Sequence, residues 1–115
     1  MLVKNFRKPK IYGMHKWELE QLTYQIGKLF QLHRLRKGLS QFQIGNELDL
    51  SSNHIGRMER GKTNPTIGII SKLCNFLEID LLVLFKKLDN KELQEIEKEI
   101  DDLQKKFKNQ NKRKS

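Results

Sequence analysis

The sequence predicts an all-α protein, with five short helices and a C-terminal helical extension. Apolar residues recur at spacings of three and four along most of the chain, and no segment alternates apolar and polar residues as a strand would. A residue that caps helices stands before four of these segments, namely Ser40, Ser51 or Ser52, Thr66 and Asp80. Gly38 and Gly61 follow two of them, where glycine can end a helix in the left-handed conformation.

The first two helices are expected at residues 16–36 and 41–48. One face of the first helix carries Leu22, Ile26, Leu29, Phe30 and His33. Ser40 and Gln43 have the spacing of a capping box, so they mark the start of the second helix, which is expected to bury Ile44 and Leu48.

The next three helices are expected at residues 52–60, 67–77 and 81–88. The helix at 52–60 is expected to bury Ile55 and Met58. The helix at 67–77 is expected to turn five residues inward, namely Ile67, Ile70, Leu73, Cys74 and Leu77.

The C-terminal part repeats apolar residues at the a and d positions of about two heptads: Leu93, Ile96, Ile100, Leu103 and Phe107. Two heptads are short for an isolated coiled coil, so this seam needs a partner surface. We expect it to pair with a second chain in a homodimer; the alternative is that it folds back on its own bundle. From Lys108 onward the composition is typical of a disordered tail.

The net charge of +9 is concentrated in the part of the chain that carries most of the apolar periodicity. Residues 1–23, the basic N-terminal arm leading into the first helix, carry +3. Residues 24–88, the expected helix-turn-helix domain, carry +5, and residues 89–115, the amphipathic helix and basic tail, carry +1. This distribution favours a polyanionic partner, nucleic acid before an acidic membrane.

The segment 39–61 predicts a helix-turn-helix. Two short helices can cross closely only where the contact residue is small, and Gly45 gives that clearance. The second of them is left with a polar outer face made of Ser52, Asn53, His54, Gly56, Arg57 and Arg60. A major groove about 12 Å wide admits one such helix, in which Asn pairs with adenine and Arg with guanine.

This segment resembles the lambda-repressor/Cro-like (XRE-type) helix-turn-helix family of phage repressors and bacterial regulators. The resemblance covers about residues 24–85 and rests on Leu39-Ser40-Gln41, Glu59-Arg60-Gly61 and Asn64-Pro65-Thr66. It departs from the family at Gly45, where alanine is usual, and at Asp49, where the turn usually has glycine. Aspartate tolerates the left-handed conformation better than most residues, so we expect the turn to persist.

The resemblance implies a five-helix bundle, a double-stranded DNA partner and the following roles. The residues expected to face base edges are Ser52, Asn53, His54 and Arg57. Those expected to contact phosphates are Gln41, Ser51, Arg60, Lys62 and Thr63. Arg34 and Glu59 hold the positions of the family's internal ion pair. The expected function is sequence-specific transcription regulation, as a repressor; the alternative is an antitoxin-type protein whose C-terminal helix binds a partner protein.

Other classes of function are not expected. His15, His33 and His54 are scattered, without a nucleophile or a carboxylate pair beside them, so we expect no enzyme activity. The single cysteine, Cys74, is expected to be buried in the core. We expect no metal, cofactor or small-molecule effector. Without a long apolar segment or a signal peptide, the expected location is the cytoplasm, away from membranes.

The role of the N-terminal arm stays open at this point. Its basic residues are Lys4, Arg7, Lys8, Lys10 and Lys16. They either contact phosphates or a minor groove, or form a solvated tail, and Trp17 is expected to anchor the arm on the bundle.

Overall fold

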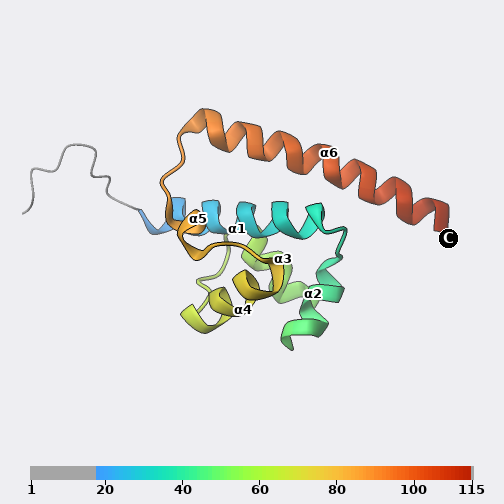
Figure 1. Cartoon of the computed structure of the whole chain (residues 1–115), viewed down its shortest axis with the longest axis horizontal. Coiled ribbons are helices and arrows are strands. Elements are labelled where there is room, and N and C mark those ends of the chain that lie inside the picture. Colours follow the sequence, from blue (N-terminus) through green and yellow to red (C-terminus); the bar gives the residue numbers. More distant parts are fainter. Residues whose placement is uncertain (1–17, 115) are drawn as a thin grey trace, which may run out of the picture.

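The computed structural model describes the backbone of residues 18–114 and the side chains of residues 18–110. This part of the chain is all helical, which confirms the predicted fold class (Figure 1). The helices are α1 (Leu19–Arg36), α2 (Gln41–Leu48), α3 (Ser52–Glu59), α4 (Ile67–Leu77), α5 (Leu81–Phe85) and α6 (Asn90–Lys114). The helix α1 lies between two layers, with α2, α3 and α4 on one side and α6 on the other (Figure 1). The basic arm, Lys16 and Trp17 lie outside the described residues.

Four helices, α2 to α5, begin at the side-chain caps that the sequence predicts, and Asp89 and Glu92 form a further capping box at the start of α6. Ser40 accepts a hydrogen bond from the amide of Gln43, whose side chain accepts one from the amide of Ser40, completing the capping box of α2. Ser51, rather than Ser52, caps α3. Thr66 and Asp80 cap α4 and α5 through amides three and two residues further on. These local contacts set the starts of α2 to α5 where the sequence places them.

Two glycines allow helices to approach each other closely. A Cβ at Gly45 would collide with the carbonyl oxygen of Leu50, so the expected clearance in the helix-turn-helix is confirmed. A Cβ at Gly27 would collide with the Met58 carbonyl, and this close approach of α1 to α3 was not expected from the sequence. Asp49 ends α2 with a φ of 60°, as predicted for a residue that tolerates the left-handed conformation.

The main core lies between α1 and the helices α2 to α5. Its buried apolar residues include Ile26, Leu29, Phe30, Ile44, Ile55, Met58, Ile70, Leu73, Leu77 and Leu84. Cys74 is buried among them, which confirms its reading as a core residue. The inward placement of Ile67 is wrong, because its side chain is 76% exposed. Ile67 is the first residue of α4, one turn ahead of Ile70, where this face of the helix has passed the edge of the core.

The C-terminal seam packs against its own chain. Ile100 forms a second buried cluster with Leu32 and Leu35 of α1, and Ile96, Leu103 and Phe107 pack against that cluster. We expected the seam to pair with a second chain. The structure instead shows the alternative, in which α6 folds back on its own bundle. The physical reason is that α1 is apolar on two faces, because Leu32 and Leu35 point away from the main core.

Three predicted helix ends also differ from the structure. α6 continues to Lys114, so the backbone from Lys108 onward is helical rather than disordered. α3 ends at Glu59, one residue before the expected Arg60. α5 ends at Phe85 rather than at residue 88.

A single buried side chain, Gln25, holds the linker that follows α5. Its amide nitrogen donates to the carbonyl oxygens of Leu84, at 3.1 Å, and Lys86, at 2.7 Å. Its amide oxygen accepts from the amide of Leu88 at 3.3 Å. These bonds fix the linker to α1. This contact could not be predicted from local sequence patterns, because Gln25 and the linker are about sixty residues apart.

Candidate nucleic-acid interface

The two helices of the helix-turn-helix pack on each other through apolar residues and present α3 at the surface. Ile44 of α2 and Ile55 and Met58 of α3 are buried in the main core. Leu48, which was expected to be buried, and Leu50 are partly buried against it. The anchored face of α3 thus lies inward, and its opposite face is free to meet a partner.

The exposed face of α3 carries most of the predicted base-contacting side chains. Ser52, Asn53 and Arg57 are exposed, while His54 is half-buried. Asn53 and Arg57 are four residues apart, so they are neighbours on one side of the helix. Gly56 was expected on the outer face, but it is buried, because it lies against the side chains of Gln41 and Arg60.

A buried ion pair joins α1 to the end of α3, as the resemblance implies. The guanidinium of Arg34 donates to both carboxylate oxygens of Glu59, with Nε to Oε2 at 2.6 Å and Nη2 to Oε1 at 3.0 Å. The remaining Nη1 donates to the carbonyl oxygen of Leu39 at 2.8 Å, just before α2. The Gln41 amide donates to Glu59 at 3.0 Å. One network therefore holds α1, the start of α2 and the end of α3 in a fixed arrangement.

The predicted phosphate-contacting residues lie at the rim of the exposed α3 face, in different environments. Arg60 and Lys62 are exposed. Ser51 is exposed, and its hydroxyl caps α3. The Thr63 hydroxyl is buried and has no hydrogen-bond partner among the residues that the structure describes. Gln41 is half-buried and already donates to Glu59.

A groove of about 420 Å³ separates this interface from the C-terminal part of α6. Gln41, Phe42 and Ser52 line one side of it, and Gln104, Phe107 and Lys108 line the other. The exposed side chains of Asn53 and Arg57 do not line it. α6 therefore borders the helix-turn-helix without covering the face of α3 that was predicted to read bases.

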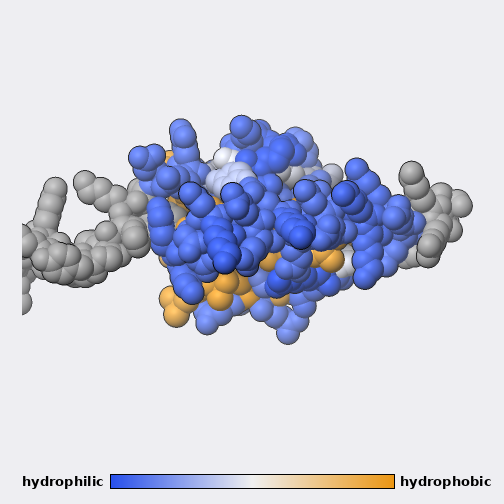
Figure 2. All heavy atoms as spheres, turned by 90° about the horizontal axis from the view of Figure 1, so that it is seen from above, coloured by the Kyte–Doolittle hydropathy of each residue, from blue (hydrophilic) through white to orange (hydrophobic). Residues whose placement is uncertain are grey.

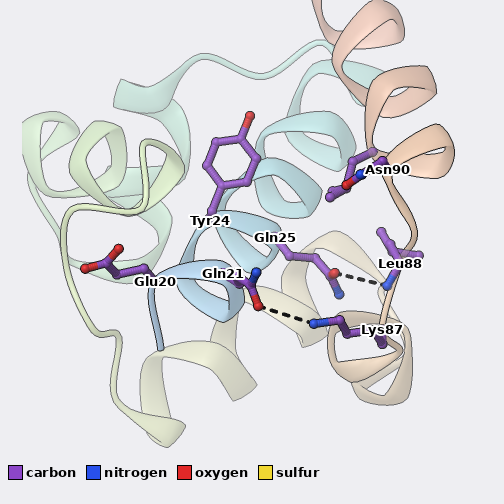
Figure 3. Close-up of a pocket in the computed structure, with 8 residues that line it drawn as sticks. Glu20, Gln21, Tyr24, Gln25, Lys87, Leu88 and Asn90 are labelled. Atoms are coloured by element: carbon purple, nitrogen blue, oxygen red, sulfur yellow. Dashed lines mark hydrogen bonds between the residues drawn. The ribbon is translucent and has the colours of Figure 1, made fainter. Parts of the chain in front are cut away.

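A second cleft, of about 430 Å³, lies between α1 and the start of α6, and none of its lining residues comes from α2 or α3 (Figure 3). At its edge the Tyr24 hydroxyl donates to the carboxylate of Glu97, and this bond raises the pKa of Tyr24 to about 12. Gln21 accepts a hydrogen bond from Lys87, and Gln25 points toward the linker (Figure 3). These contacts serve the packing of α6 on α1.

The surface of the described residues is mostly hydrophilic on the side of α6 (Figure 2). Apolar atoms are visible along one edge, at the end of the molecule where α5 lies (Figure 2). Four side chains of α5 are exposed: Leu81, Leu82, Val83 and Phe85. Among residues 18–114, no helix is long and apolar enough to cross a membrane.

Comparison with known proteins gives a matching family and a relative. Residues 31–84 match a family described as helix-turn-helix. The chain is 38% identical over 61 residues to an HTH-type transcriptional regulator, SlrR, of Bacillus subtilis. That match covers 52% of this chain and 40% of the relative, so the chain spans less than half the length of that protein. No solved structure matches significantly.

The matched segment begins in α1 and ends in α5, so it contains the whole of α2, α3 and α4. The family match and the capped, glycine-spaced geometry of α2 and α3 thus agree with the resemblance found in the sequence: residues 31–84 of this chain are similar to the helix-turn-helix family.

Proposed function

We propose that this protein is a sequence-specific double-stranded DNA-binding transcriptional regulator, which reads the major groove with α3. The observation that carries the proposal is the exposed pair of Asn53 and Arg57 on a helix whose other face is fixed in the core. A rigid helix with two adjacent hydrogen-bonding side chains can meet the edges of neighbouring base pairs.

The proposed base contacts follow the exposure of the side chains on α3. Asn53 suits adenine and Arg57 suits guanine, and each good bidentate contact contributes about 1–3 kcal/mol of discrimination. Ser52 and His54 are the neighbouring base-facing side chains. The phosphate contacts are assigned to Gln41, Ser51, Arg60, Lys62 and Thr63, because they surround the start and the end of α3.

We further propose a repressor of the Cro/C1 type that occupies its operator as a homodimer. The relative's name, an HTH-type transcriptional regulator, supports regulation of transcription. The exposed apolar residues of α5 offer a surface that a second copy can cover, since association buries such surfaces. A dimer of this kind reads two half-sites about 10 base pairs apart or a multiple of that. The DNA partner places the protein in the cytoplasm, at the nucleoid.

The antitoxin-type alternative finds less support. It needs the C-terminal helix to offer an apolar face to a partner protein. In the structure that face is used, because Ile100 and Phe107 pack against Leu32 and Leu35 of α1.

The direct test is selection of bound sites from random duplex DNA by the full chain. A single enriched, two-fold symmetric sequence is the expected result, and the absence of any enriched sequence would contradict the proposal. On the selected site, Arg57→Ala should lose about 1–3 kcal/mol of binding free energy and much less on an unrelated duplex. Equal losses on both duplexes would remove Arg57 from the base-reading set.

Lys62→Ala is the matched control, because it removes a positive charge just beyond the C-terminal end of α3, at a residue proposed to contact phosphate rather than a base. Its affinity should fall alike on all duplexes, and the salt slope should fall by about one unit. A loss confined to the selected site would show that Lys62 reads a base instead.

A further inference from the structure

The charge of α6 is divided sharply along its length. Residues 89–102 contain seven acidic and two basic residues, whereas residues 103–115 contain six basic residues and no acidic one. The small net charge of the whole segment hides this division. The acidic half is used for packing on α1: Glu97 accepts from Tyr24, and Glu99 forms an ion pair with Arg36 at 2.7 Å.

The basic half of α6 lies beside the helix-turn-helix. Phe107 packs against the cluster of Leu32, Leu35 and Ile100, and this contact fixes the rotation of the helix about its axis. Lys108 lines the groove of about 420 Å³ whose other side includes Gln41 and Ser52, the first residues of α2 and α3.

Lys106 faces a different way. It lines a separate hollow with Arg36 and Gly38, at the end of α1. Lys106 and Lys108 are two residues apart, so they lie about 200° apart around the helix, on opposite flanks of Phe107. The two lysines therefore have the same charge and nearly the same position along α6, and only Lys108 borders the helix-turn-helix.

From this geometry we propose that the basic end of α6 is a second DNA-contacting surface, with Lys108 binding the phosphate backbone beside the starts of α2 and α3. The inference rests on the proposed function, since it concerns the same duplex. A helix that enters a major groove has a phosphate backbone on each side of it. A lysine that borders the amino-terminal ends of α2 and α3 stands beside one of those backbones, where a cation replaces condensed counterions.

The experiment compares Lys108→Ala with Lys106→Ala in the full chain, by measuring duplex affinity from 50 to 300 mM salt, a range of about sixfold. One lost phosphate contact lowers the salt slope by about 0.9, which corresponds to an affinity loss of about eightfold at 0.1 M salt. We expect this from Lys108→Ala on selected and random duplexes alike, and less than about a twofold change from Lys106→Ala. Both side chains are exposed, so circular dichroism should show an unchanged fold.

Three results would overturn the inference. Equal losses from both variants would mean that the basic end acts only through its long-range field. Wild-type affinity for Lys108→Ala would mean that the DNA does not reach α6, and binding of an acidic protein by this end would then be the remaining use. If the full chain bound no duplex, the proposed function and this inference would fail together, whereas in the first two cases only the inference fails.

Discussion

Two ion pairs on α1 allow a direct measurement of what burial contributes to an arginine–glutamate contact. Arg34 meets Glu59 through two bonds of 2.6 and 3.0 Å, and Arg36 meets Glu99 through two bonds of 2.7 Å. Both arginines are on α1, and both contacts are bidentate. The side chains of the first pair are 6% and 4% exposed, and those of the second pair are 47% and 41% exposed.

The change to make is Glu→Gln in each pair, because it keeps the shape of the side chain and removes its charge. Glu59→Gln leaves the buried Arg34 guanidinium without a countercharge, which should cost about 3–5 kcal/mol of folding free energy. Glu99→Gln leaves Arg36 in contact with water, so the expected cost is about 0–1 kcal/mol. A domain with a total stability of about 5–15 kcal/mol would be only marginally folded after the first change.

Urea denaturation followed by far-ultraviolet circular dichroism measures both losses on the same protein. The Glu99→Gln effect should disappear in about 1 M salt, where the screening length is about 3 Å, and the Glu59→Gln effect should persist. Joint replacement of Arg34 by Met and Glu59 by Leu should recover much of the loss, because no buried charge is left. Losses from Glu59→Gln and Glu99→Gln that agree within about 0.5 kcal/mol would refute the reasoning from burial.

Three further predictions concern single side chains. Gly27→Ala should lower the melting temperature, because its Cβ collides with backbone oxygens of α3, at a cost of about 1–3 kcal/mol. Gly68→Ala should raise it, because a Cβ there makes only an ordinary contact with the Thr66 hydroxyl, at 3.8 Å, and equal shifts would contradict this. Burial and the nearby charge of Arg36 lower the pKa of His33 below its usual 6.5, so the contribution of His33 to stability is complete above 6.5 and declines as the pH falls toward the lowered pKa. His33→Gln should remove this decline in unfolding free energy between about pH 7 and 5. If the decline persists unchanged in the variant, other groups cause it. Burial raises the pKa of the Cys74 thiol, so a thiol reagent should modify it at the rate of unfolding, and fast modification of the native protein would contradict its place in the core.

The sequence predicts those parts of the fold that depend on neighbours along the chain. The caps at Ser40, Thr66 and Asp80 involve residues two or three positions apart, so their spacing is readable directly. Arg34 and Glu59 are 25 residues apart, and only the family resemblance identified them as a pair. The exposure of Asn53 and Arg57 followed from the periodicity of the buried residues on α3.

What could not be predicted depends on where whole helices lie. Periodicity placed Ile67 on the apolar face, but it cannot show that the face extends beyond the core at that point. The same limit applies to the seam of α6, since an apolar stripe is equally suited to a second chain or to Leu32 and Leu35 on its own α1. The residues of the proposed interface follow from local patterns, whereas the groove between them and Lys108 follows from the docking of α6.

The three hydrogen bonds of Gln25 bear on how two copies of this protein can assemble. A terminal helix often forms a dimer by domain swapping, in which the hinge straightens and the helix packs on the other copy. Here the hinge would be residues 86–89. Gln25 of α1 bonds the Lys86 carbonyl and the Leu88 amide within this segment, and the Leu84 carbonyl just before it. Exchange of α6 would pull the Lys86 carbonyl and the Leu88 amide away from Gln25 and leave it only the Leu84 carbonyl of α5. Assembly by exchange is therefore disfavoured, and two copies are left to meet as intact folded units.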